Sequence, residues 1–281
     1  MTVDKGVLYI VATPIGNLGD ISARGIDVLR QVDLIAAEDT RHTKPLLRHL
    51  NVSTPLQAMH EHNEKAQLDG LIDRLVSGQA IALVSDAGTP LISDPGFPLV
   101  RECHRRRIRI SPVPGACAAI AALSASGLAT DRFRFEGFPP RTSSARQLLF
   151  RNLRVESATL VFYEASHRIR ESLADMTVVF GVDRRAVLAR ELTKLHETIL
   201  SAELGELDAL LERDPNQRKG EFVILVAGAL KKAGVVSPEA VRVLDILRES
   251  LPLKQAASLA ARISGEKKNQ LYQLALKQDQ G

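Results

Sequence analysis

The chain has 281 residues, enough for two or three domains of ordinary size. Apolar residues make up 45% and charged residues 25%, which is typical of a folded globular protein and excludes a disordered chain. The net charge of +4 is uneven, because the segment from Lys231 onward holds nine Lys or Arg and only five Asp or Glu and so carries all of the excess. Such a segment favours a polyanionic partner.

The sequence gives no sign of export, of a membrane span or of a metal site. The two cysteines, Cys103 and Cys117, have neither disulfide nor metal-binding spacing, so we expect reduced thiols. Residues 1–6 lack a leader pattern, and the least polar stretch, 115–129, is shorter than the roughly 20 apolar residues of a membrane helix. We therefore expect a soluble, cytoplasmic protein.

The first part of the chain alternates between short apolar runs and helical patterns. The helical patterns cover residues 21–31 and 65–77. The apolar runs are typical of buried strands and cover residues 7–12, 34–37, 81–84 and 108–110. This alternation predicts an α/β domain with a mostly parallel sheet.

An unusual segment follows each of these strands. The segments, rich in Gly, Pro and polar residues, are 13–20, 38–43, 85–96 and 112–116. Because the carboxyl ends of parallel strands share one edge, we expect the four segments to meet there, where open α/β sheets bind ligands.

A second α/β unit and a helical unit are predicted further along. Strands are expected at 133–138, 159–163, 186–189 and 222–227, with helices at 145–153, 167–175 and 203–213. Three short helices follow at 238–249, 253–263 and 266–277. With a linker near 124–130, the predicted domains are 1–123, 131–232 and 235–281.

Two loops that follow predicted strands contain two glycines each, and only the second has the composition of a binding site. The segment 16–19 matches neither the dinucleotide-binding fingerprint nor a P-loop, which argues against both classes. The segment 86–96 contains two Gly, two Pro and two Asp, which is typical of a specifically shaped loop. Asp86 or Asp94 could bind a ribose or an amine, although capping explains either one alone equally well.

The segment 38–42 offers two carboxylates, a cation and an imidazole at a strand end. One of Glu38, Asp39 and His42 could accept a proton from a hydroxyl nucleophile. Equally, Asp39 or Thr40 could cap a helix. The nearby segment 60–64 resembles a metal cluster only loosely, without the spacing of zinc hydrolases, and we predict no metal there.

Five motifs in chain order resemble one family. It is the small-subunit ribosomal RNA methyltransferase I family, the cytidine 2'-O-methyltransferases of the tetrapyrrole methylase superfamily. The motifs are residues 8–20, 37–43, 83–96, 114–118 and 163–168. The resemblance implies two α/β domains with S-adenosylmethionine bound between them, a homodimer, and a C-terminal helix-turn-helix domain that fits the basic segment.

The resemblance also implies site residues and a substrate. The substrate is a ribose 2'-hydroxyl of a cytidine in small-subunit (16S) ribosomal RNA, as free RNA or in the assembled subunit. Carried over by motif, the donor contacts are Asp86, Gly88, Leu91, Ile92, Asp94, Gly115, Ala116, Tyr163 and Glu164. Our hypothesis is that Glu38, Asp39 or His42 takes the hydroxyl proton with help from Asn17, while Lys194 or Arg41 holds a flanking phosphate.

Two other functions remain open. A small tetrapyrrole could be the methyl acceptor, although such a substrate does not need a basic helical tail. A non-catalytic RNA-binding protein is the other alternative, and the shaped loops at one sheet edge argue against it.

Overall fold

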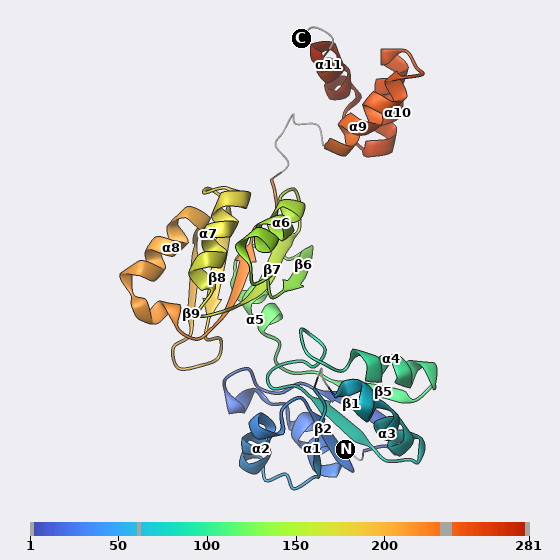
Figure 1. The fold of residues 1–281 in the computed structure, drawn as a ribbon, viewed down its shortest axis with the longest axis vertical. Coiled ribbons are helices and arrows are strands. Elements are labelled where there is room, and N and C mark those ends of the chain that lie inside the picture. The colour runs from blue at the N-terminus through green and yellow to red at the C-terminus, as the bar shows by residue number, and fades with distance from the viewer. Residues whose placement is uncertain (1–2, 61–62, 231–237, 279–281) are drawn as a thin grey trace. The chain divides into compact units, whose positions relative to one another are not determined.

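The computed structural model describes residues 3–60, 63–230 and 238–278 (Figure 1). The chain divides into two compact units. The first unit is Met1–Gly228 and contains both sheets. The second is Ala229–Gly281, in which the described residues form only helices.

The first sheet is entirely parallel, as predicted. Its order is β3-β2-β4-β1-β5. The strands are β1 Val7–Val11, β2 Leu34–Ala37, β3 Leu56–Ala58, β4 Ile81–Val84 and β5 Arg109–Val113. The central strands are apolar throughout because helices cover both faces of the sheet.

Two helices pack on each face of this sheet. One core cluster joins the sheet to α1 Ala23–Gln31 and α2 Thr40–His49, and another joins it to α3 Glu64–Val76 and α4 Phe97–Arg105. The predictions missed α2, α4 and β3. The start of α2 looks like a polar loop and Pro45 lies inside the helix, while β3 has only three residues.

The second sheet is mixed, with order β6-β7-β10-β8-β9, and only β6 and β7 are parallel. Its strands are β6 Phe133–Gly137, β7 Thr159–Ala165, β8 Arg185–Arg190, β9 Thr198–Glu203 and β10 Glu221–Val226. The predictions missed β9, whose half-exposed pattern lacks an apolar run.

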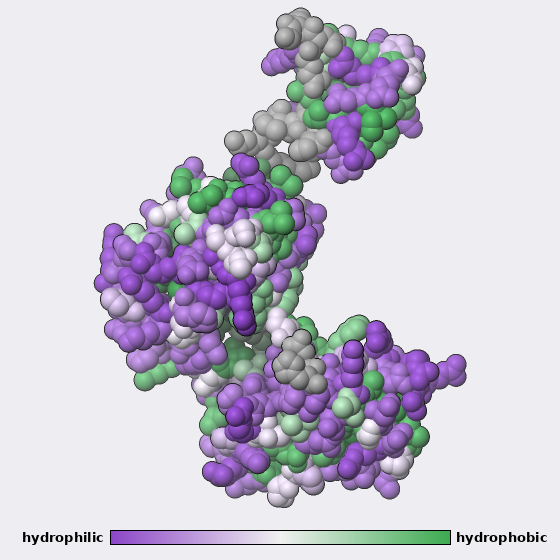
Figure 2. Space-filling model, viewed as in Figure 1, coloured by the Kyte–Doolittle hydropathy of each residue, from purple (hydrophilic) through white to green (hydrophobic). Residues whose placement is uncertain are grey.

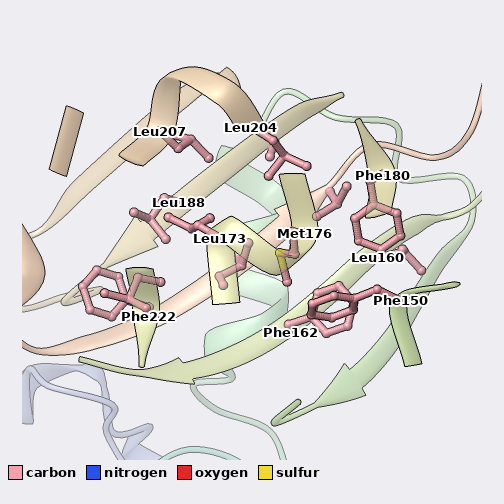
Figure 3. Close-up of a cluster of buried hydrophobic side chains, with 14 of the residues drawn as sticks. Phe150, Leu160, Phe162, Leu173, Met176, Phe180, Leu188, Leu204, Leu207 and Phe222 are labelled. Atoms are coloured by element: carbon pink, nitrogen blue, oxygen red, sulfur yellow. The ribbon is translucent and has the colours of Figure 1, made fainter. Parts of the chain in front are cut away.

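Different helices pack on the two faces of the second sheet. Three helices share one core with it: α6 Ser143–Leu153, α7 Ile169–Phe180 and α8 Leu204–Arg213. Phe150 and Phe162 meet edge to face in that core, 5.6 Å between ring centroids (Figure 3). The short α5, Ala118–Ala125, covers the other face, although most of it belongs to the predicted first domain, 1–123, and its end overlaps the predicted linker at 124–130.

The second unit has a small core of its own. Its helices are α9 Pro238–Arg248, α10 Leu253–Ser264 and α11 Lys268–Gln278, close to the predicted bounds. Ala and Leu side chains from all three pack together. Gly265 ends α10 with a φ of 74°, the left-handed conformation that glycine adopts most easily.

Hydrophilic residues cover much of the visible surface around all of these elements (Figure 2). In the described parts of the chain, every helix is too short or too polar to cross a lipid bilayer.

Candidate active site

The strand-end segments of the first sheet meet strand ends of the second sheet around a cavity of about 350 Å³. From the first half of the chain, the lining residues are Ile15, Glu38, Asp86, Ala87, Gly88, Thr89, Ile92, Ser93, Asp94, Cys117 and Ala118. From the second half, they are Phe138, Tyr163, Glu164, Ala165, Ala189, Leu192, Glu221, Phe222 and Val223. The volume lies within the range of small-molecule sites, about 300–1,000 Å³.

The direction of β10 explains why residues from the start of this strand line the cavity together with residues from the ends of β7 and β8. The carboxyl ends of β7 and β8 reach the cavity, and β10 runs antiparallel to both, so its first residues lie at the same edge. A rule that looks only after strands could not find Glu221 or Phe222.

The loop from Asp86 to Gly96 has an unusual backbone. Gly88 and Gly96 have φ of 83° and 125°, and Leu91 and Ser93 have φ of 72° and 70°. Positive φ costs a non-glycine residue about 1–3 kcal/mol, so the surrounding structure must hold this shape. Such strain is concentrated at ligand sites.

The turn at Gly115 and Ala116 supports this loop from outside the cavity. The Thr89 hydroxyl donates to the Ala116 carbonyl at 2.9 Å. A side chain at Gly115 would place its Cβ 2.9 Å from the Cβ of Ala12, so only glycine lets the two segments approach. Neither Gly115 nor Ala116 lines the cavity.

Three carboxylates stand close together at the first sheet's edge: Glu38, Asp86 and Asp94. Burial raises the pKa of Asp94 to about 6, and the negative charges of Glu38 and Asp86 add to the effect. Burial also raises the pKa of Glu38, with repulsion from Asp86 and Asp39 in the same direction. Both groups therefore take up protons more readily than ordinary carboxylates.

Asp86 organises its neighbours through both oxygens. Oδ1 accepts from the backbone N–H of Asp39 at 3.0 Å, and Oδ2 lies 2.8 Å from Nδ1 of His42. The hydrogen bond to Asp86 raises the pKa of His42. His42 itself is two-thirds exposed and lines neither cavity of this region.

Asp39 is occupied by structural contacts. Its side chain caps α2 by accepting from the Arg41 N–H at 2.7 Å and pairs with the Arg41 guanidinium at 2.6 Å. These hydrogen bonds hold the pKa of Asp39 far below its usual range. Asn17 also has a capping contact, because its side chain accepts from the Gly19 N–H at 2.9 Å.

A second cavity of about 460 Å³ adjoins the first. Its lining residues are Glu38, Asp39, Thr40, Arg41, Ala58, His60 and Asp86. Glu38 and Asp86 belong to both cavities, so these two side chains stand where the cavities meet.

The second-sheet wall is aromatic at the cavity and ionic behind it. The ring of Tyr163 contacts Phe138 edge to face with centroids 5.6 Å apart, and burial raises the pKa of its hydroxyl. The side chain of Glu164 is fully buried and binds Arg168 and Ser172. Arg168 in turn donates to the Pro139 carbonyl at 2.6 Å, which fastens the segment that carries Phe138.

The structure brings most of the sequence-predicted residues together, but not all of them to the cavity. Those that line it are Glu38, Asp86, Gly88, Ile92, Asp94, Tyr163 and Glu164. Those that do not are Asn17, Asp39, His42, Leu91, Gly115 and Ala116. Lys194, considered for a phosphate, lies 2.9 Å from both Glu191 and Glu221, which neutralise it.

Sequence reasoning missed several lining residues. Phe138 and Phe222 are apolar residues at strand ends, and nothing in their local sequence distinguishes them from core residues. As for metals, no three His, Cys, Asp or Glu side chains of the described residues are placed so that they could hold a metal ion together, and Glu61 and His62 of the segment 60–64 lie outside the described residues.

Two family models match successive parts of the chain, the first over both sheets up to residue 208 and the second over the three C-terminal helices. A model described as Tetrapyrrole (Corrin/Porphyrin) Methylases matches residues 7–208. A model described as RsmI C-terminal HTH domain matches residues 235–279.

Curated relatives match over nearly the whole chain. A Pseudomonas aeruginosa protein named ribosomal RNA small subunit methyltransferase I is 56% identical, covering 96% of this chain and 97% of its own length. The protein of the same name from Escherichia coli O157:H7 is 53% identical, with coverages of 98% and 96%.

Solved structures show the same fold at low identity. Diphthine synthase has a TM-score of 0.60 at 17% identity, covering 79% of this chain and 90% of its own. Cobalt precorrin-4 methyltransferase has a TM-score of 0.54 at 17% identity, with coverages of 79% and 95%. At such identities the likeness concerns the fold alone.

Proposed function

The chain belongs to the ribosomal RNA small subunit methyltransferase I family of tetrapyrrole methylases, and from this premise we propose that it methylates a cytidine ribose 2'-hydroxyl in small-subunit ribosomal RNA with S-adenosylmethionine. The observation that carries the proposal is the first cavity, where segments from both sheets surround a space with three carboxylates.

The lining suits this donor chemically. S-adenosylmethionine carries a sulfonium and an ammonium group, and Glu38, Asp86 and Asp94 supply negative charge for them. Apolar residues such as Ile92, Phe138 and Leu192 suit its adenine ring. In the proposal, Asp94, the backbone of the Gly88 loop and Tyr163 hold the donor, while Leu91, Gly115 and Ala116 keep that loop in shape.

The second cavity is the proposed place of the acceptor ribose, because it meets the first cavity at Glu38 and Asp86. The donor supplies a methyl carbon whose bond to sulfur breaks as its bond to the ribose oxygen forms. The hydroxyl proton must then pass to a base.

Glu38 is the proposed base. It stands at the junction, and its raised pKa strengthens it as a proton acceptor. Asp39 is a poorer candidate, because Arg41 and the helix cap occupy its oxygens. His42 is proposed to act through Asp86, whose carboxylate it orients, and Asn17 to shape the loop after β1.

The RNA substrate is supported by the names of the relatives and by the basic second unit. Its described residues, 238–278, include seven Lys or Arg and four Asp or Glu, and Lys231 and Lys232 lie outside the described residues. Free or assembled small-subunit RNA as partner, a homodimer and a cytoplasmic location complete the proposal and rest on the resemblance.

The experiment measures donor binding by calorimetry and methyl transfer from radiolabelled donor to small ribosomal subunits from cells lacking this protein. We expect saturable donor binding and one ribose-methylated cytidine on mass spectrometry of the RNA. Transfer to an added porphyrinoid instead would favour the tetrapyrrole alternative, and RNA binding without donor binding the non-catalytic one. Either result would refute the proposal.

A further inference from the structure

The exposed face of α2 is positively charged along its whole length. Arg41, Lys44 and Arg48 are all exposed, and at spacings of three and four residues they share one side of the helix. The helix contains no acidic residue.

Two of these cations have no ion-pair partner among the residues that the structure describes. Arg41 pairs with Asp39, but no carboxylate among the described residues lies within ion-pair distance of Lys44 or Arg48. Exposed ion pairs contribute little, so Arg41 can also exchange its partner for another anion.

A second basic cluster, at the end of α4 and the start of β5, differs in this respect. Arg105 and Arg106 both pair with Glu102, and Arg109 pairs with Asp4. Glu102 and Asp4 neutralise these three arginines in part, and no residue of the cluster lines either cavity, whereas Thr40 and Arg41 of α2 line the second cavity.

The position of α2 connects this charge to the second cavity. The helix begins directly after β2, and Thr40 and Arg41 of its first turn line that cavity. Arg48 lies about 10 Å further along the helix axis. A stacked strand would present about three phosphates over this length, at about 3.4 Å per nucleotide.

We propose that Arg41, Lys44 and Arg48 form a phosphate-binding track that guides the RNA strand next to the acceptor nucleotide. This inference rests on the proposed function, because it takes the second cavity as the acceptor site. A small tetrapyrrole held in the cavity would have no use for a charge on the last turn of the helix. A polyanionic strand that continues out of the cavity would meet all three cations.

The test removes two charges in each of two matched variants of the full chain. Lys44→Gln combined with Arg48→Gln changes the proposed track. Arg101→Gln combined with Arg107→Gln removes two exposed cations from the α4 region, where neither forms an ion pair among the described residues. Affinity for small subunits from cells lacking this protein is measured between 50 and 200 mM salt, together with donor affinity and methylation rate.

We expect the α2 variant to bind small subunits on the order of tenfold more weakly at 0.1 M salt. The slope of log affinity against log salt should fall by about 1.4, at about 0.7 per phosphate contact. KM for the subunit should rise while kcat at saturation and donor affinity stay unchanged, and the α4 variant should behave like the wild type.

Equal affinities and salt slopes for the two variants, in a wild type that methylates small-subunit RNA, would overturn this inference and leave the proposed function intact. Loss of binding to the assembled subunit with unchanged affinity for free ribosomal RNA would point to a ribosomal protein as partner and also overturn it. A wild type that methylates no RNA would overturn the proposed function itself.

Discussion

At the scale of single residues, Glu38 and Asp39 are adjacent carboxylates with opposite electrostatic environments. Burial and neighbouring negative charges raise the pKa of Glu38, whereas hydrogen bonds from Arg41 lower that of Asp39. A carboxylate with a raised pKa is a stronger base when it is ionised, so it is better suited to accept a proton from a substrate. The pair therefore offers a matched test of which group is the base.

Glu38→Gln should lower kcat by about two to four orders of magnitude, the usual contribution of a general base. Donor affinity should change far less. Asp39→Asn keeps a capping side chain and should retain most of the activity. Steady-state kinetics with small subunits as substrate measures both, and equal losses in the two variants would contradict the assignment.

The raised pKa of Asp94 predicts opposite pH trends for the stability of the protein and for donor binding. Its folded-state pKa is about 6 against a usual 3.8, so the folded protein binds more protons between these values. Its contribution to stability therefore falls as pH rises from about 4 to 6. The ionised form attracts the cationic donor, so donor affinity should rise about tenfold from pH 5 to pH 7.

Asp94→Asn should remove both trends. Without donor, the variant should melt at a higher temperature than the wild type at pH 8. At pH 4 the two proteins should have the same melting temperature. Its donor affinity should be weaker and independent of pH. Thermal melts and calorimetry across this range test the prediction, and a wild-type donor affinity that is flat between pH 5 and pH 7 would refute it.

The sequence locates the site better than it ranks the residues within it. Gly, Pro and Asp after β4 identify the loop 86–96 because those residue types have backbone and hydrogen-bonding properties that can be read locally. The environments that separate Glu38 from Asp39 depend on Asp86 and Arg41 in three dimensions. Burial and partner geometry cannot be read from one strand-end motif.

At the scale of elements, the shape of the loop 86–96 depends on glycine at position 88. Gly88 has a φ of 83°, and a Cβ there would lie 3.2 Å from the Cγ2 of Ile15. Gly88→Ala should cost about 1–2 kcal/mol for the left-handed backbone and weaken donor binding on the order of tenfold.

Gly70→Ala is the matched control. Gly70 lies within α3, and a Cβ there would meet no atom within 4 Å. Replacing a helical glycine by alanine stabilises by about 0.5–1 kcal/mol, so this variant should melt at a higher temperature with unchanged donor affinity. A Gly88→Ala protein with wild-type donor affinity would show that the loop shape is not needed.

Which elements are predictable from sequence follows from their burial. The apolar strands β1, β2 and β4 are buried on both faces, so their composition alone identifies them. The edge strands β3 and β9 are half exposed and leave no such signal. The direction of β10 depends on pairing with β7 and β8, which no local pattern encodes.

At the scale of the whole molecule, the two compact units have separate hydrophobic cores. The core of α9, α10 and α11 contains no residue from the first unit, and the cavities belong entirely to the first. The second unit should therefore affect RNA affinity and leave donor binding alone. The division of the first unit into domains 1–123 and 131–232 stays a prediction.

Removal of residues 235–281 should leave the melting temperature of the remainder and its donor affinity nearly unchanged. Affinity for small subunits should fall, with a shallower salt dependence, because six exposed cations are lost: Arg242, Lys254, Arg262, Lys267, Lys268 and Lys277. In the full chain, Lys267→Gln with Lys268→Gln should lower the salt slope by about 1.4, while Arg101→Gln with Arg107→Gln should not. A truncated protein that binds small subunits as tightly as the full chain, with the same salt slope, would exclude the second unit from RNA binding and leave the track on α2 as the main cationic surface for the substrate.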